Sequence, residues 1–173
     1  HRHSSTLRLM ATSIDIECFD GEYTFRLTME HIAALEDACS AGIGEIYART
    51  LAGRYTDGET SFVNPLEGRY RYGELIQIIR QGLIGGNSGL VDGRQIAVNS
   101  TKANTLIKTY VHTDRDNPIE RAWELAATIL HACVHGYEPA LEEAQKKSET
   151  EEAPESGSNQ GESSQTASRS TAP

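Results

Sequence analysis

Hydrophobic and polar residues alternate in two short segments near the start of the chain, at residues 14–19 and 23–27. Strict alternation is typical of a β-strand with one buried face. Asp20 and Gly21 separate the two segments, and this pair favours the positive φ angles of a tight turn. The pattern therefore predicts a β-hairpin. Because two strands alone are only marginally stable, one face of the hairpin must pack against the rest of the chain or a partner.

Apolar residues recur every three or four positions in five later segments, which is typical of amphipathic helices. These segments cover about residues 29–41, 43–52, 72–84, 101–113 and 118–135. We expect Thr28, Ser100 and Asn117 to be N-caps, with Pro118 at the first position of the last helix. The fold class predicted from these patterns is α+β and mostly α, with an N-terminal hairpin followed by about five short helices.

Turn-forming residues dominate two stretches between the helices, near residues 54–69 and 87–99. Asp57-Gly58 and Asn64-Pro65 lie in the first stretch, and the second is polar and rich in glycine. We expect both to be exposed loops or insertions. The predicted organisation is a disordered or non-native leader at 1–13, a hairpin and helical domain at 14–139, and a tail at 140–173.

Residues 140–173 differ in composition from the rest of the chain. They contain seven Glu, three Lys or Arg and many Ser, and their one large aliphatic residue is Leu141. Such a segment cannot bury enough apolar surface to fold, so it is predicted to be a disordered acidic tail.

Charge and hydropathy exclude two classes of partner. The 173 residues carry 16 basic and 25 acidic side chains, a formal net charge of −9, and no basic run is longer than Lys146-Lys147. Nucleic acid is therefore a poor expectation, because phosphate binding needs clustered cations. The apolar runs fall far short of the roughly 20 residues that cross a bilayer, so a cytoplasmic protein without membrane contact is predicted.

Three motifs resemble chemical sites but lack essential parts. His131 and His135 share a helix face, yet the intervening residues lack the glutamate of a zinc protease motif and a third ligand is missing. The glycine-rich run at 82–87 follows a helix rather than a strand and has no phosphate-loop ending. Ser88 has no nucleophile-elbow sequence around it. The sequence thus predicts no catalytic residue, cofactor or metal site, and the protein is not expected to be an enzyme.

Several stretches together resemble the gene-transfer-agent family of phage tail proteins. These stretches are residues 20–27, 35–39, 41–42, 45–49, 51–54 and 82–86, together with the last apolar helix and the acidic tail after it. The resemblance spans roughly residues 14–138. It is interrupted near 54–69 and 90–100, which look like insertions relative to the usual pattern.

The resemblance implies a non-catalytic tail assembly chaperone of a phage, prophage or gene transfer agent. Such a protein would bind the tape-measure protein, the tail-tube protein or both while the tail forms. The alternative is a structural tail component, a tube subunit or adaptor, which would be associated with the virion. A small cytoplasmic enzyme with an unrecognised pocket is a distant alternative, and a homo-oligomer is compatible with each of the three.

Aromatic residues are the predicted partner-binding positions. Tyr23 and Phe25 share one face of the hairpin because side chains alternate along a strand. Tyr47 lies on the second helix, and Trp123 lies one position away from the apolar stripe of the last helix. The alternative for Tyr23, Phe25 and Trp123 is that they pack in the protein's own core.

Overall fold

The computed structural model describes residues 10–57 and 60–136. The predicted tail at 140–173 and residues 1–9 of the predicted leader lie outside these ranges. Met10 and Ala11, where the described part begins, lie against Gly136, which follows the last helix.

The first hairpin is confirmed, with strands β1 (Ile14–Cys18) and β2 (Gly21–Phe25) running antiparallel. Its turn lies one residue earlier than predicted, because Phe19 takes the positive φ of 61° and Gly21 is already in β2. Glycine is needed at position 21 for another reason. A Cβ there would lie 2.3 Å from the carbonyl oxygen of Leu90 in the neighbouring strand.

The five predicted helices are present in the described residues. They are α1 (Met29–Cys39), α2 (Ile43–Leu51), α3 (Tyr72–Gly86), α4 (Ser100–Tyr110) and α5 (Ile119–His135). Two short 3₁₀ turns, η1 (Pro65–Glu67) and η2 (Thr113–Arg115), lie between them.

The predicted helix caps are correct in one case and displaced in two. Thr28 caps α1, since its Oγ1 accepts a hydrogen bond from the amide of His31. Asn99 rather than Ser100 caps α4, because its Oδ1 accepts from the amide of Lys102 at 2.9 Å. The N-cap of α5 is Pro118 rather than Asn117.

Asn117 does not cap α5 but binds backbone carbonyls at the end of α4. Its side-chain amide donates to the carbonyl oxygens of Thr109, at 3.1 Å, and His112, at 2.9 Å. These carbonyls lie at the end of α4 and just beyond it, where a helix leaves its last acceptors unpaired. Asn117 therefore ties the end of α4 to the start of α5.

The prediction of loops at 54–69 and 87–99 is wrong, because each stretch contains a further hairpin. β3 (Arg54–Asp57) pairs with β4 (Thr60–Val63), and β5 (Ser88–Val91) pairs with β6 (Arg94–Ile96). β5 also pairs antiparallel with β2, which gives a four-stranded sheet in the order β1-β2-β5-β6. These short strands are stabilised by pairing with their neighbours, and their sequences carry no regular apolar pattern that would have predicted them.

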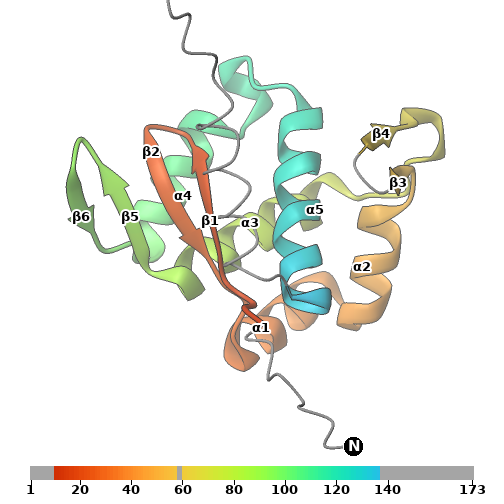
Figure 1. The fold of residues 1–173 in the computed structure, drawn as a ribbon, viewed down its shortest axis with the longest axis horizontal. Helices are drawn as coiled ribbons and strands as arrows, with labels where there is room; N and C mark the ends of the chain where they lie inside the picture. The colour runs from red at the N-terminus through yellow and green to blue at the C-terminus, as the bar shows by residue number, and fades with distance from the viewer. Residues whose placement is uncertain (1–9, 58–59, 137–173) are drawn as a thin grey trace, which may run out of the picture. The chain divides into compact units, whose positions relative to one another are not determined.

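The helices lie on one face of the four-stranded sheet, with α3 at their centre (Figure 1). α3 contacts β2 as well as α1, α4 and α5. The core between these elements is built largely from aliphatic side chains of α3 and α5 and aromatic side chains of β2. Its fully buried members include Tyr23, Phe25, Leu35, Ile46, Leu75, Ile78, Ile79, Leu83, Trp123 and Leu130.

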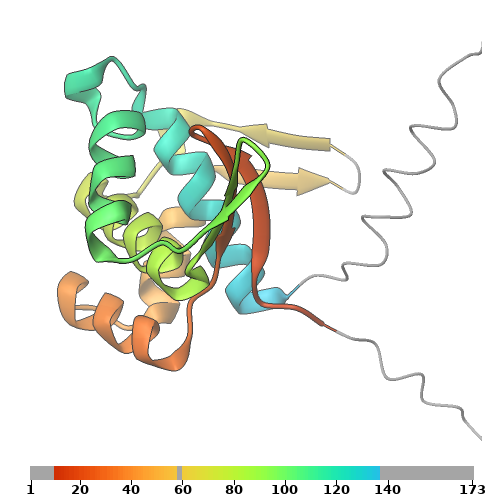
Figure 2. The same cartoon turned by 90° about the vertical axis from the view of Figure 1, so that its left-hand side faces the viewer.

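The β3–β4 hairpin, called the arm below, is separate from the four-stranded sheet. Figure 2 shows its two strands extending away from the helices. Tyr55 of β3 lies opposite Phe62 of β4, and their rings stack with centroids 5.1 Å apart. Both side chains are exposed, so the arm carries an apolar pair that the described residues leave open to solvent.

Candidate partner-binding site

β1 is the first strand of the sheet order, so one of its edges has no strand beside it among the described residues. The two-residue turn makes Cys18 and Gly21 a hydrogen-bonded pair, and such pairs alternate along an antiparallel ladder. Ile14, Ile16 and Cys18 therefore bond to β2. The backbone N–H and C=O groups of Asp15 and Glu17 point to the free edge.

A groove of about 490 Å³ runs beside this edge, between β1 and α5. We call it the β1 groove. It is lined by Ile16, Glu17, Cys18, Phe19, Tyr110, Val111, Asn117, Arg121, Ala122, Glu124, Leu125 and Thr128. Its floor combines apolar side chains with a few polar ones, and its volume lies in the range of binding clefts, about 300–1,000 Å³.

Phe19, which lines the groove, has an unusual backbone conformation with a φ of 61°. A positive φ is uncommon for a bulky residue and costs on the order of 1–3 kcal/mol. Its ring stacks on Tyr110 at 5.5 Å and meets Tyr23 at 5.7 Å and Phe25 at 6.5 Å. This aromatic packing offsets the cost of the turn and holds the end of β1 in place.

The face of the sheet that points away from the helices is acidic near the free edge. Asp15 and Glu17 are exposed on it, and Glu22 of β2 lies directly opposite Glu17. Like charges placed opposite each other destabilise a sheet. Asp15 accepts a hydrogen bond from the Thr24 hydroxyl at 2.6 Å, whereas the described polar contacts assign no such partner to Glu17 or Glu22.

Cys18 is the thiol that lines the groove. Burial, assisted by the charge of Asp20, raises the pKa of this thiol to about 12. The thiol therefore stays protonated near neutral pH and is a poor nucleophile. In the groove it acts as a small apolar side chain.

Three of the four predicted partner-binding residues lie in the core. Tyr23 and Phe25 are 0% exposed and Trp123 is 1% exposed. Tyr23 donates to Asp20 Oδ1, and the indole Nε1 of Trp123 donates to the carbonyl oxygen of Thr50 at 2.7 Å. These side chains are thus packed as in the core alternative, and a direct role in partner binding stays a prediction.

Tyr47 lies elsewhere, on α2, and is half-buried. Its hydroxyl forms a hydrogen bond with Nε2 of His135 at 2.7 Å, and the ring of His135 lies 4.7 Å from that of His131. The structure therefore brings Tyr47 to the two histidines at the end of α5. The described residues hold no cluster of three or more His, Cys, Asp or Glu that could bind a metal ion.

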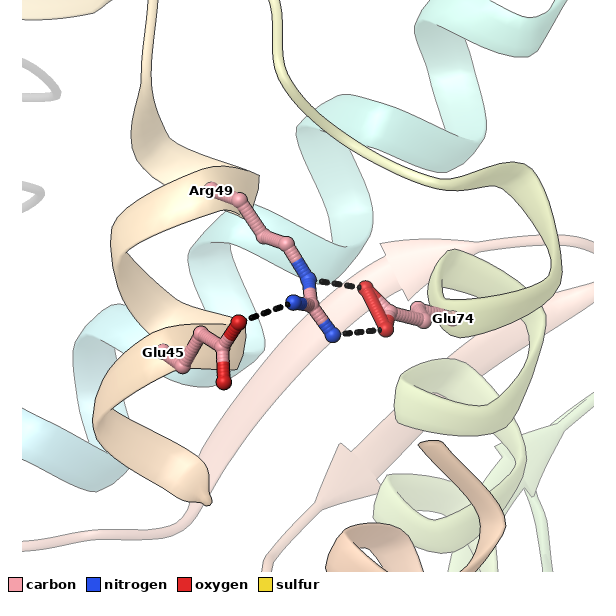
Figure 3. Close-up of polar contacts among 3 residues, drawn as sticks. All are labelled: Glu45, Arg49 and Glu74. Carbon is pink, nitrogen blue, oxygen red and sulfur yellow. Dashed lines mark hydrogen bonds and ion pairs between the residues drawn. The ribbon is translucent and has the colours of Figure 1, made fainter. Parts of the chain in front are cut away.

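An ion pair joins α2 to α3 (Figure 3). The guanidinium of Arg49 donates from Nε to Oε1 of Glu74 at 2.6 Å and from Nη2 to Oε2 of the same carboxylate. Its Nη1 donates to Glu45 at 2.8 Å, one turn earlier on α2. The hydrogen bonds to Glu74 raise the pKa of Arg49. Arg49 and Glu74 are both largely buried. Their bidentate contact fixes α2 against α3 and thereby positions the arm, which follows α2.

The glycine-rich run at 82–87 has a structural explanation. A Cβ at Gly86 would lie 1.8 Å from the carbonyl oxygen of Thr24, and one at Gly85 would lie 1.9 Å from that of Arg26. Glycine thus lets the end of α3 approach the backbone of β2 and the residue after it. Ser88, in β5, accepts a hydrogen bond from the Gln95 side chain at 3.0 Å.

The sequence interpretation missed the β1 groove, although part of its signal was visible. Alternation places Asp15 and Glu17 on one face of β1 and the apolar residues on the other. Whether β1 is an edge strand depends on the pairing of β2 with β5, more than 60 residues later in the chain. In the part of the chain that the structure describes, no helix is both long and apolar enough to span a membrane.

Comparison with known proteins connects this region to phage tails. Residues 11–61 match the model of a family described as "Phage tail tube protein, GTA-gp10". The predicted resemblance to a gene-transfer-agent family of phage tail proteins is thus confirmed over this segment, which includes β1, β2, α1, α2 and β3. The searches of curated proteins and of solved structures found no match. The family match supports a role in the structure or assembly of a phage tail and contacts with other tail components.

Proposed function

We propose that the protein is a non-catalytic assembly chaperone that binds tape-measure or tail-tube proteins while a phage or gene-transfer-agent tail forms. The observation that carries this proposal is the match of residues 11–61 to a phage tail family. The matched segment contains β1, whose free edge borders the β1 groove of about 490 Å³. As a chaperone, the protein would act in the cytoplasm of the producing cell.

The modest size of the sheet favours a chaperone over a tube subunit. A tail tube is built from rings in which large sheets of neighbouring subunits join. Here the main sheet has four strands of three to five residues, and helices cover one of its faces. A small helical domain with an open strand edge is better suited to holding one partner segment at a time.

A structural tail component, a tube subunit or adaptor, is the second candidate. The description of the matched family as a tail tube protein favours it directly. The exposed Tyr55–Phe62 pair on the arm also favours it, because an apolar projection can be covered by a neighbouring subunit. The two candidates differ in one consequence, since a subunit stays in the finished particle and a chaperone leaves it.

Co-expression with a tape-measure protein of the same phage or gene transfer agent tests the chaperone. We expect the tape-measure protein to be mostly insoluble alone and soluble, in a complex, when this protein is present. An unrelated acidic protein of similar size is the control for a general effect of charge on solubility. A tape-measure protein that is equally insoluble with either partner would contradict the proposal.

A further inference from the structure

We propose that β1 binds its partner by strand addition, and that the bound segment is an extended strand in which basic and apolar residues alternate. The inference deepens the proposed function, on which it rests only for assigning that segment to a tail protein. The surface and the chemistry follow from the sheet, the groove and the charges described above.

The backbone of β1 supplies the first part of the argument. The N–H and C=O groups of Asp15 and Glu17 point away from β2, toward the β1 groove. An extended segment in the groove can pair with these groups and continue the four-stranded sheet by one strand. The other edge of the sheet is less suitable, because β6 has only three residues and offers a shorter backbone for pairing.

The side chains beside the edge determine which residues the added strand carries. Residues opposite Asp15 and Glu17 lie on the acidic face, where Glu22 adds a third carboxylate. Lys or Arg at these positions would relieve the repulsion between Glu17 and Glu22. The residue between them lies opposite Ile16 and points into the groove, toward Leu125 and Ala122. An apolar side chain fits that position.

Charge also argues against a second copy of this chain as the occupant. Antiparallel pairing of two β1 strands centred on Ile16 would place Asp15 of one copy opposite Glu17 of the other. Carboxylates would then face carboxylates on both sides of the centre, which disfavours pairing. The acidic edge therefore selects a basic partner and rejects its own copy.

Hydrogen exchange of the full chain tests the edge itself. In the free protein, the amides of Asp15 and Glu17 should exchange much faster than those of Ile16 and Cys18. A short synthetic peptide in which Lys and Val alternate should then protect Asp15 and Glu17. Protection of these two amides before peptide is added would overturn the proposal, because the edge would already be occupied by another part of the chain or by a second copy.

Fluorescence anisotropy measures binding of the same peptide and tests separately the backbone hydrogen bonds and the alternation of basic and apolar side chains. N-methylation of alternate peptide amides keeps the side chains and removes the hydrogen-bond donors, and it should weaken binding about tenfold or more. A peptide of the same composition with all Lys before all Val should bind about tenfold less tightly as well. Equal binding of all three peptides would mean that the peptide is held by charge attraction alone, and it would overturn the proposal.

Variants of the protein separate the contribution of the Glu17 backbone amide to peptide binding from that of its side-chain charge. Glu17→Pro removes the outward amide at an edge position where proline is tolerated, and Glu17→Gln removes only the charge. We expect Glu17→Pro to weaken peptide binding more than Glu17→Gln does. Glu22→Gln is the matched control, since it lowers the same charge on the same face while its amide points to β5. If Glu17→Pro does not fold, the N-methylated peptide decides the question on the unaltered chain.

Glu17→Lys tests whether the charge preference for the bound peptide can be reversed. The variant should bind a peptide of alternating Glu and Val better than the unaltered protein does, and the Lys and Val peptide about tenfold less tightly. Unchanged preference would contradict the assignment of a basic strand. None of these assays contains a tail protein, so their failure would leave the tail role standing, and failure of the co-expression experiment would leave the strand-binding edge standing.

Discussion

The hairpins β1–β2 and β3–β4 have the same connectivity and differ in what lies behind them. In β2, Tyr23 and Phe25 are 0% exposed because α3 and its neighbours cover their face. In the arm, Tyr55 is 43% and Phe62 is 54% exposed, and the two rings stack on each other. An aromatic residue on a strand is therefore a core residue in one hairpin and a surface residue in the other, and tertiary packing makes the difference.

The largest difference between the hairpins should appear when one aromatic side chain is removed from each. Phe25→Ala leaves a cavity in the core and should lower the free energy of unfolding by about 3–5 kcal/mol. Phe62→Ala removes only the stacked pair of the arm and should cost under about 1.5 kcal/mol. Urea denaturation of both variants measures the two values. Equal losses would mean that the arm is as firmly packed as the first hairpin.

The attachment of the arm should depend on the ion pair between α2 and α3. Glu74→Gln removes the buried one of the two carboxylates that Arg49 contacts and should destabilise the protein by about 3 kcal/mol. Glu45→Gln is the matched control, because Glu45 binds the same guanidinium but its side chain is 66% exposed. That variant should cost about 0.5 kcal/mol or less. Chemical denaturation of the pair would contradict this account if Glu45→Gln were the more damaging change.

The junction between the first hairpin and β5 should be sensitive to a single methyl group. Gly21→Ala places a Cβ 2.3 Å from the Leu90 carbonyl oxygen, so β2 and β5 must separate, at a cost of about 1–3 kcal/mol. Gly44→Ala, on the helix that leads to the arm, meets nothing within 4 Å. It should stabilise the protein by up to about 1 kcal/mol. Thermal unfolding should therefore shift in opposite directions, and a lower midpoint for both variants would be inconsistent with the described packing.

The smallest predicted effect concerns the facing carboxylates of the first hairpin. Glu22→Thr removes the repulsion with Glu17 and should raise stability by about 0.5 kcal/mol at low salt. High salt should shrink this gain, because the charges are near the surface. In the arm, Thr56 lies opposite Ser61, and the double change Thr56→Glu with Ser61→Glu should cost a similar amount. A gain for Glu22→Thr that is independent of salt would show that repulsion is not its cause.

Periodic burial explains which parts of the fold were predictable. The first hairpin and the five helices each bury one continuous face, so their apolar residues repeat with the period of the element. Helix starts were harder to predict, because Asn99 and Ser100 can both act as N-caps and one hydrogen bond decides between them. The arm was missed because its strands bury no continuous face and therefore leave no regular apolar pattern.

The β5–β6 hairpin was missed for a different reason, since a local signal was present. Asp92 and Gly93 form its turn with φ angles of 50° and 74°, and an Asp-Gly pair is a strong sign of such a turn. The features of the site had no comparable signal. The contact between Arg49 and Glu74 joins positions 25 residues apart, and the free edge of β1 exists only because β5 pairs with the other side of β2. Both depend on the tertiary arrangement.

The protein content of purified particles tests the central claim of a chaperone role most directly. Quantitative mass spectrometry of tails, and of complexes isolated from the producing cells before tails are complete, would give the stoichiometry in each. The account predicts that the protein is absent from finished tails and present with the tape-measure or tail-tube protein in the assembly complexes. Stoichiometric presence in finished tails would contradict the chaperone and identify a structural tail component.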